Sequence, residues 1–222
     1  MATRASTQRA LACAALALPA LFIGQAQAAE IYVPFGLPGA GVGFAQPIGE
    51  LFAVRADYMT LGQREKDTVE DGIAYNGQYK LNRGALLVDL FPMAGTFRFT
   101  LGATFNTYKV ALDASGAGGT LEIGDRTYNT TAADGLNVLV DFPKTTPYFG
   151  IGWGHQLASG WRFSADLGAA IGKAKVSATV RGQLANQPTI QADIDKELAE
   201  LRDGVGKVKA IPQVSFAIGY SF

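Results

Sequence analysis

Six charged residues are placed to form one network of ion pairs. Each lies on the small or polar face of a segment in which apolar and polar residues alternate. The set holds three cations and three carboxylates: Arg55, Asp57, Asp89, Arg98, Arg162 and Asp166. Charges removed from bulk water must pair, because an isolated buried ion is very costly. The balanced set therefore predicts a paired network in an enclosed space. That network either only fills the space or lines a narrow path for water or a small solute.

Catalytic chemistry has little support in the residues. The chain has one histidine, His155, which we expect in a solvated turn. There is no G-x-S-x-G or H-E-x-x-H pattern and no second histidine to share a metal. The glycine-rich segment 116–119 lacks the Lys-Ser/Thr pair of a phosphate-binding loop. We predict no catalytic residue, no cofactor and no metal site, and hence a protein that is not an enzyme.

The elements that must position the charges are β-strands. Four segments, 51–59, 96–106, 147–153 and 161–171, place large apolar residues on one face and small or polar residues on the other. This period of two is typical of strands. In a secreted β-sandwich the apolar face would turn to a core. In a transmembrane barrel it would turn to lipid, with the polar face lining the lumen.

The last segment has the same alternation. Its large residues are Pro212, Val214, Phe216, Ile218, Tyr220 and Phe222, and those between them are small or polar. It resembles the closing strand of bacterial outer-membrane barrels, whose final aromatic residue is read by the assembly machinery. By that resemblance, Phe222 is the predicted assembly signal.

The N-terminus has the features of a secretory signal peptide over residues 1–28. Arg4 and Arg9 precede an apolar run over 11–23, and the cleavage site is the small-x-small triplet 26–28. The mature chain, 29–222, is expected to be one barrel domain. Removing the signal takes two arginines from a chain with 19 Lys+Arg and 19 Asp+Glu. The slightly acidic remainder argues against nucleic acid as a partner. The only cysteine, Cys13, leaves with the signal, so no disulfide is expected.

The connections fall into a short and a long set. Short turns are expected at 47–50, 92–95 and 155–160, and long loops at 61–71, 108–137 and 181–207. Outer-membrane barrels have short periplasmic turns and longer extracellular loops. The two sets alternate along the chain if 30–37 is a short first strand and 72–91 is one long strand. The total is then eight strands.

Segment 72–91 contains a change of phase. Its first half has apolar residues at odd positions, such as Tyr75 and Leu81, and its second half has them at even positions, such as Leu86 and Val88. A β-bulge near residues 82–84 would keep one strand. A two-residue hairpin at 82–83 would add a strand. The bulge is favoured because it preserves the alternation of short and long connections.

The last long loop has the period of an amphipathic helix over residues 189–203. Its apolar stripe is Ile190, Ile194, Leu198 and Leu201, and acidic residues lie between them. Such a helix would cover the barrel mouth or lie on the outer surface, or else act as a lid or partner-binding helix. Its acidic face argues against insertion among anionic lipid headgroups.

Four segments together resemble the eight-stranded outer-membrane family that includes outer membrane proteins W and A. They are 42–54, 86–92, 146–154 and 215–222. The resemblance implies an all-β fold, an eight-stranded antiparallel transmembrane β-barrel, to which the periodicity of 189–203 adds a short helix in the last extracellular loop. It also implies the outer membrane of a Gram-negative bacterium, contact with outer-membrane lipid and lipopolysaccharide, and insertion by the barrel assembly machinery. The implied function is passage or binding of a small hydrophobic solute. The alternative is a structural or surface-interaction barrel with a closed, side-chain-filled lumen.

Overall fold

The computed structural model describes residues 28–222, except 71–72, 117–118, 156–158 and 205–208. Apart from its last residue, the predicted signal peptide lies outside the described residues. No helix in the described part of the chain is long and apolar enough to cross a membrane.

The strands form one closed antiparallel ring of eight passages, as predicted. The first five passages are β1 (Glu30–Gly36), β2 (Gly39–Ile48), β3 (Phe52–Glu70), β4 (Ile73–Leu90) and β5 (Phe97–Gly116). The last three are β8 (Gly135–Asp141) with β9 (Thr145–Trp153), β10 (Gly160–Ile171) with β11 (Lys175–Arg181), and β12 (Ala210–Ser221). The ring closes where β1 pairs with β12, from Glu30 opposite Ser221 to Gly36 opposite Ser215.

The alternation assigns the two faces of the ring. In β12, Phe216 and Ile218 point outward and are exposed, whereas Gln213 and Ala217 point inward and are buried. The outward aromatics pair at the end that holds the short turns, with the rings of Trp161 and Tyr220 5.6 Å apart. The outer surface is therefore an apolar band with aromatic residues at its turn end.

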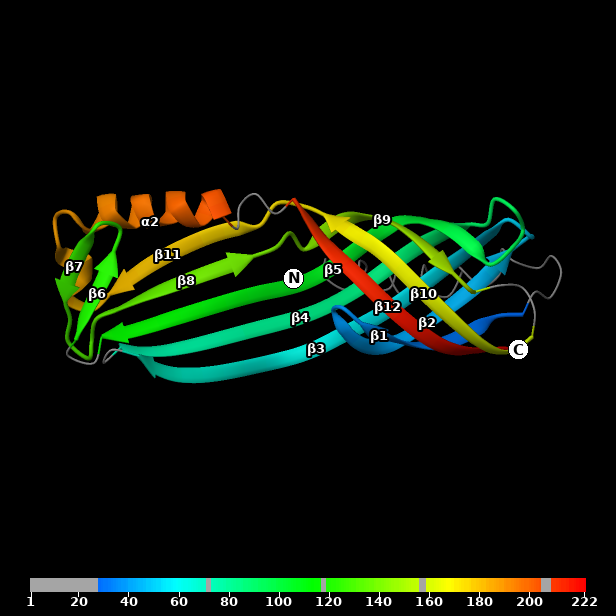
Figure 1. The fold of residues 1–222 in the computed structure, drawn as a ribbon, viewed down its shortest axis with the longest axis horizontal. Coiled ribbons are helices and arrows are strands. Elements are labelled where there is room, and N and C mark those ends of the chain that lie inside the picture. Colours follow the sequence, from blue (N-terminus) through cyan, green and yellow to red (C-terminus); the bar gives the residue numbers. More distant parts are fainter. Residues whose placement is uncertain (1–27, 71–72, 117–118, 156–158, 205–208) are drawn as a thin grey trace, which may run out of the picture.

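The strands have unequal lengths, which divides the molecule into two parts (Figure 1). The pairing of β2 with β3 stops at Ala40 opposite Thr60, and that of β10 with β12 stops at Ile171 opposite Ala210. Beyond these positions an open sheet in the order β11-β8-β5-β4-β3 continues. We call this sheet the extension: β3 from residue 62, β4 up to residue 81, β5 from residue 108, and all of β8 and β11.

The prediction of long loops at 61–71 and 108–137 is wrong, because strands of the extension occupy much of both segments. Residues 61–71 were expected to form a loop, but β3 continues through Glu70. Much of 108–137 is likewise strand, and it includes a small hairpin of β6 (Thr120–Ile123) and β7 (Arg126–Asn129). The polar composition of these segments led to the prediction of loops. They are strands of a sheet that is exposed to water on one face, and their backbone N–H and C=O groups bond to neighbouring strands.

The prediction of one long strand over 72–91 is confirmed, but neither the bulge near 82–84 nor the hairpin at 82–83 is present. β4 is one strand whose register with β5 runs unbroken from Ile73 opposite Gly116 to Leu90 opposite Phe99. The irregularity lies in the neighbouring strand, where Leu61 is an extra residue between two paired positions of β3.

Odd residues of β4 point inward throughout. The apolar residues switch from odd to even positions because the surroundings of each face change along the strand. Leu86 and Val88 point outward on the apolar band. Leu81 and Tyr75 point inward, and each packs against an apolar cluster of the extension.

The predicted helix is present as α2 (Ile190–Gly204), preceded by a short 3-10 helix, η2 (Gly182–Asn186). Its stripe is buried against inward residues of the extension, including Leu136 and Val176, and against the β6–β7 hairpin. Lys196 pairs with Asp125 and fastens α2 to that hairpin. The helix therefore lies along the inner face of the extension and not on the outer surface. A separate cluster of buried apolar residues lies where the barrel meets the extension: Tyr108, Phe142, Ala170 and Ala174.

Candidate functional site

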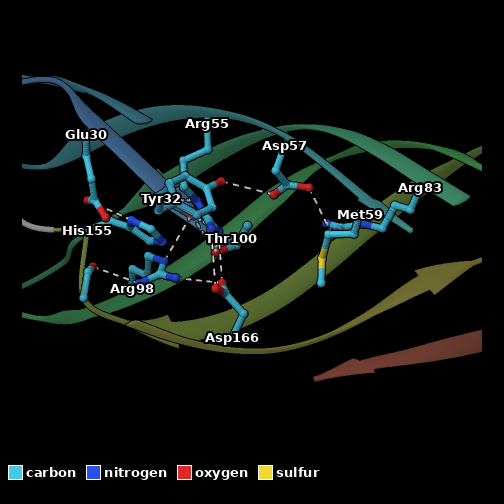
Figure 2. Close-up of polar contacts among 12 residues, drawn as sticks. Glu30, Tyr32, Arg55, Asp57, Met59, Arg83, Arg98, Thr100, His155 and Asp166 are labelled. Carbon is cyan, nitrogen blue, oxygen red and sulfur yellow. Dashed lines mark hydrogen bonds and ion pairs between the residues drawn. The ribbon is translucent and has the colours of Figure 1, made fainter. Parts of the chain in front are cut away.

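Four of the six predicted residues form one buried ion cluster in the barrel (Figure 2). Arg55 on β3 contacts Asp89 on β4 at 2.5 Å and Asp166 on β10 at 3.0 Å. Arg98 on β5 contacts Asp166 at 2.7 Å and Asp89 at 3.5 Å. Each cation thus meets both carboxylates, and the cluster spans the lumen from side to side.

Asp57 belongs to a second cluster that the sequence analysis did not complete. Its carboxylate contacts Arg83 at 3.1 Å and accepts a hydrogen bond of 3.2 Å from the Tyr32 hydroxyl. The guanidinium of Arg83 also lies 5.4 Å from the centre of the Tyr148 ring. Arg83 was missed because the chain was expected to change phase there. Continuing the alternation inward from Asp89 would have found it.

Arg162, the sixth predicted residue, lies on the inward face of β10 opposite Gly219 of β12. It is half-buried and four residues nearer the turn end than Asp166. Arg162 also interacts with a partner of its own. The distances above give the predicted lumen network a geometric basis at the other five residues.

Glycines on the inward face make room for the large lumen side chains. A Cβ added at Gly152 would lie 2.7 Å from the guanidinium carbon of Arg98, and one at Gly43 would lie 2.2 Å from the Tyr32 ring. A side chain at either position would force the arginine or the tyrosine out of its place. The small residues on the inward face therefore leave room for the arginine and tyrosine side chains that extend across the lumen.

His155 is buried, and its predicted solvated position is wrong. The side chain is 2 % exposed, and its Nδ1 lies 2.9 Å from the carboxylate of Glu30 on β1. The ring also lies 4.5 Å from that of Tyr32. The backbone turns back at Gly154 and His155, which both have positive φ, and this directs the imidazole into the barrel. Glu30 was also missed, although it shares the inward face of β1 with Tyr32.

Little free space remains between these side chains. The void bounded by Tyr32, Arg55, Asp57, Arg83 and Asp166 has a volume of about 10 Å³. A water molecule needs at least about that much room. At this level the lumen is filled by paired side chains.

The inner face of the extension is a second candidate surface. Three cross-strand rows run from β3 to β11, and their order follows from the strand registers. They are Arg64–Tyr79–Val110–Val140–Val176, Lys66–Gly77–Leu112–Val138–Ala178 and Thr68–Tyr75–Ala114–Leu136–Val180.

The helix α2 covers only the β11 side of these rows. On the β3 side, Tyr79, Val110 and Leu112 are 38 %, 49 % and 42 % exposed. We call these three residues the open patch. Sequence analysis missed it because 108–137 was expected to be a loop.

The fold has counterparts among solved structures. Acinetobacter baumannii CarO2 is 16 % identical with a TM-score of 0.57, and the match covers 90 % of this chain and 100 % of that one. Acinetobacter baumannii CarO is 14 % identical with a TM-score of 0.53, covering 87 % and 97 %. Both are outer-membrane barrel proteins. This chain has the fold of a small outer-membrane β-barrel.

No protein-family model and no curated protein matches the sequence of this barrel. The resemblance drawn from the sequence is thus confirmed at the level of the fold. In outer-membrane barrels generally, the short turns are periplasmic and the longer connections are extracellular.

Proposed function

We propose that this protein is a non-enzymatic barrel of the Gram-negative outer membrane that binds a small hydrophobic solute on its extracellular extension. In this proposal the lumen does not conduct. Lipopolysaccharide and outer-membrane lipid contact the apolar band, the assembly machinery reads Phe222, and nucleic acid is not a partner.

The filled lumen is the observation that supports a barrel that does not conduct. Arg55, Arg98 and Asp89 are almost fully buried and linked to one another. Removing one partner of such a buried pair costs roughly 3–5 kcal/mol. Opening a path would break several of these contacts at once, which disfavours a resting pore.

The open patch supports the binding part. Single exposed apolar residues are ordinary on protein surfaces. Tyr79, Val110 and Leu112 instead lie together on adjacent strands, on the inward side of a sheet whose other half is buried under α2. Contiguous apolar surface of this kind commonly marks a ligand or partner site.

A surface-interaction role is the second candidate, and the free edges of the extension favour it. Beyond its last pair with β2, β3 pairs only with β4, and β11 pairs only with β8 among the described residues, so each leaves one strand edge free. Exposed strand edges can pair with another chain. The charges along β3 are of the kind that discourages such pairing, so we place solute binding first.

The test combines conductance with photolabelling of the refolded protein. In planar bilayers we expect no steady conductance. In lipid nanodiscs, an uncharged diazirine-bearing alkyl alcohol should label peptides that contain the open patch.

Leu112→Asn should reduce that labelling. Leu139→Asn, on the outward face of the same sheet, is the matched control and should not. A stable conducting state, or equal labelling of both variants and the unmodified protein, would contradict the proposal.

A further inference from the structure

Residues 64–67 of β3 alternate in charge, and this sorts the charges by face. Arg64 and Lys66 share the inward side, since they pair with Tyr79 and Gly77 of β4. Glu65 and Asp67 fall on the outward side by the alternation of the strand. Over residues 64–67, the inward face of this edge is therefore basic and its outward face acidic.

Both cations border the open patch. Arg64, Tyr79 and Val110 are consecutive members of one cross-strand row, and Lys66, Gly77 and Leu112 are consecutive members of the next. A Cβ added at Gly77 would meet only the Lys66 carbonyl oxygen, at 3.7 Å. The surface between Lys66 and Leu112 is therefore open. Strands lie about 4.8 Å apart, so the cations stand within roughly 10 Å of the apolar side chains on β5.

These two cations are not neutralised. Among the described residues, neither Arg64 nor Lys66 has an ion pair or a side-chain hydrogen bond, whereas Arg181 pairs with Asp113 elsewhere on the extension. The three inward rows contain no carboxylate at any position. An uncompensated positive edge beside an apolar floor is complementary to a molecule with an anionic head and a hydrocarbon chain.

We infer that the open patch binds a free single-chain carboxylate amphiphile of the fatty-acid class. The chain lies on Tyr79, Val110 and Leu112, and the carboxylate meets Arg64 and Lys66. Arginine suits this head group because its planar donors match a carboxylate. The inference rests on the proposed solute-binding function and names its ligand class. A diffusible amphiphile is favoured over a bilayer lipid because the patch is on the inward face of the extension, away from the outward face that continues the apolar band.

The experiment compares one hydrocarbon chain with and without its charge. The probes are a diazirine-bearing dodecanoate and its methyl ester. They are applied to the full mature protein in phosphatidylcholine nanodiscs, and labelled peptides are mapped by mass spectrometry. The acid should label the open patch about tenfold or more over the ester, because a hydrogen bond to a charged group contributes more than a neutral one. Raising the salt concentration should shrink that ratio.

The test variant is Arg64→Gln with Lys66→Gln, which should lower acid labelling to the ester level. The control is Lys80→Gln with Lys109→Gln. These two lysines are exposed, opposite each other on β4 and β5, and on the outward face at the same height. The control should label as the unmodified protein does. Heat-modifiable migration on gels checks that both variants are folded.

Three outcomes would overturn the inference. Equal labelling by acid and ester, unchanged in the Arg64–Lys66 variant, would remove the anionic ligand but leave apolar solute binding intact. Absence of patch labelling by either probe would remove both. Acid labelling that lipopolysaccharide blocks and excess dodecanoate does not would assign the site to a bilayer lipid.

Discussion

The guanidinium of Arg98 donates a hydrogen bond of 2.8 Å to the carbonyl oxygen of Gly154. A side chain inside the barrel thus holds the backbone at the start of the turn that follows β9. The same arginine contacts Asp166 on β10. Arg98 therefore joins the lumen network to the turn end of the barrel, where His155 meets Glu30.

Arg98→Ala should destabilise the barrel strongly, because Asp166 and Asp89 would each lose one of two cationic partners. The expected loss approaches roughly 3–5 kcal/mol, less whatever Arg55 still compensates. Urea unfolding from lipid vesicles measures it. Arg126→Ala, on the exposed β6–β7 hairpin, should change the unfolding free energy little. A silent Arg98→Ala would show that the network does not stabilise the barrel.

Gly152→Ala should also destabilise the barrel, because the new methyl group would lie 2.7 Å from Arg98 and 2.8 Å from the backbone oxygen of Ala165. Overpacking of this kind typically costs about 1–3 kcal/mol. Gly84→Ala is the matched control, since its nearest neighbour would be Phe105 at 3.9 Å. Equal unfolding midpoints for the two variants would contradict the close packing described for the lumen.

Leu198→Asp should release α2 from the extension without unfolding the barrel. Leu198 is buried against the extension, and the strand hydrogen bonds do not depend on it. Protease cleavage near Arg202 in intact cells should increase, while heat-modifiable migration stays normal. Conductance should stay flat because the lumen has its own closure. Ala199→Asp, at an exposed position, is the control. Cleavage of the unmodified loop only from the periplasmic side would reverse the topology.

The Asp113–Arg181 pair should make the edge of the extension sensitive to acid. A hydrogen bond from Arg181 holds the pKa of Asp113 below its usual range. A carboxylate whose pKa is lowered by folding stabilises the protein above its unfolded value, about 3.9, and this contribution is lost as pH falls through the folded value. The unmodified protein should therefore exceed Asp113→Asn in stability at pH 7, and the difference should vanish at strongly acidic pH. Thermal unfolding at both pH values measures it. A difference that persists in acid would assign the effect to packing.

Phe222→Ala should lower outer-membrane assembly in cells more than it lowers folding in detergent. The side chain is exposed, while its backbone N–H donates to the Ala29 carbonyl oxygen at 3.0 Å, a bond that the substitution keeps. Outer-membrane levels and refolding yields are the two measurements, with Phe216→Ala as a comparison on the same face. Equal losses for the two variants would remove the special role of the terminal residue.

The immersed part of this fold could be predicted from sequence because lipid imposes a strict period of two. From Phe97 to Asn106 of β5, large apolar residues alternate with polar or small ones, and β3 and β10 show the same alternation around Arg55 and Asp166, so the inward charges could be predicted from it. Because opposite charges in a narrow lumen lie close together, their pairing could be predicted as well.

The extension could not be predicted in the same way. Its inward face is apolar and its outward face is polar, which is the reverse of the barrel. Along one continuous strand the apolar residues therefore change from one set of alternate positions to the other, and in the sequence this looks like the end of the strand. For that reason the sequence did not predict the inward position of Arg83 or the open patch. The burial of His155 was not predicted for a different reason. It depends on a turn that folds back into the barrel through positive φ at Gly154 and His155.

The reversal of faces along β4 and β5 also has a consequence for depth. The outward side turns polar at Asn82 opposite Thr107, where the inward side turns apolar at Leu81 opposite Tyr108. In the proposed membrane-spanning orientation, this level lies at the surface of the bilayer. Paired residues inserted above it, one on each of two neighbouring strands, would raise the ligand-binding part further from the cell without changing how far the barrel is immersed. The two parts can therefore diverge separately in evolution, and the upper one can be exchanged by design.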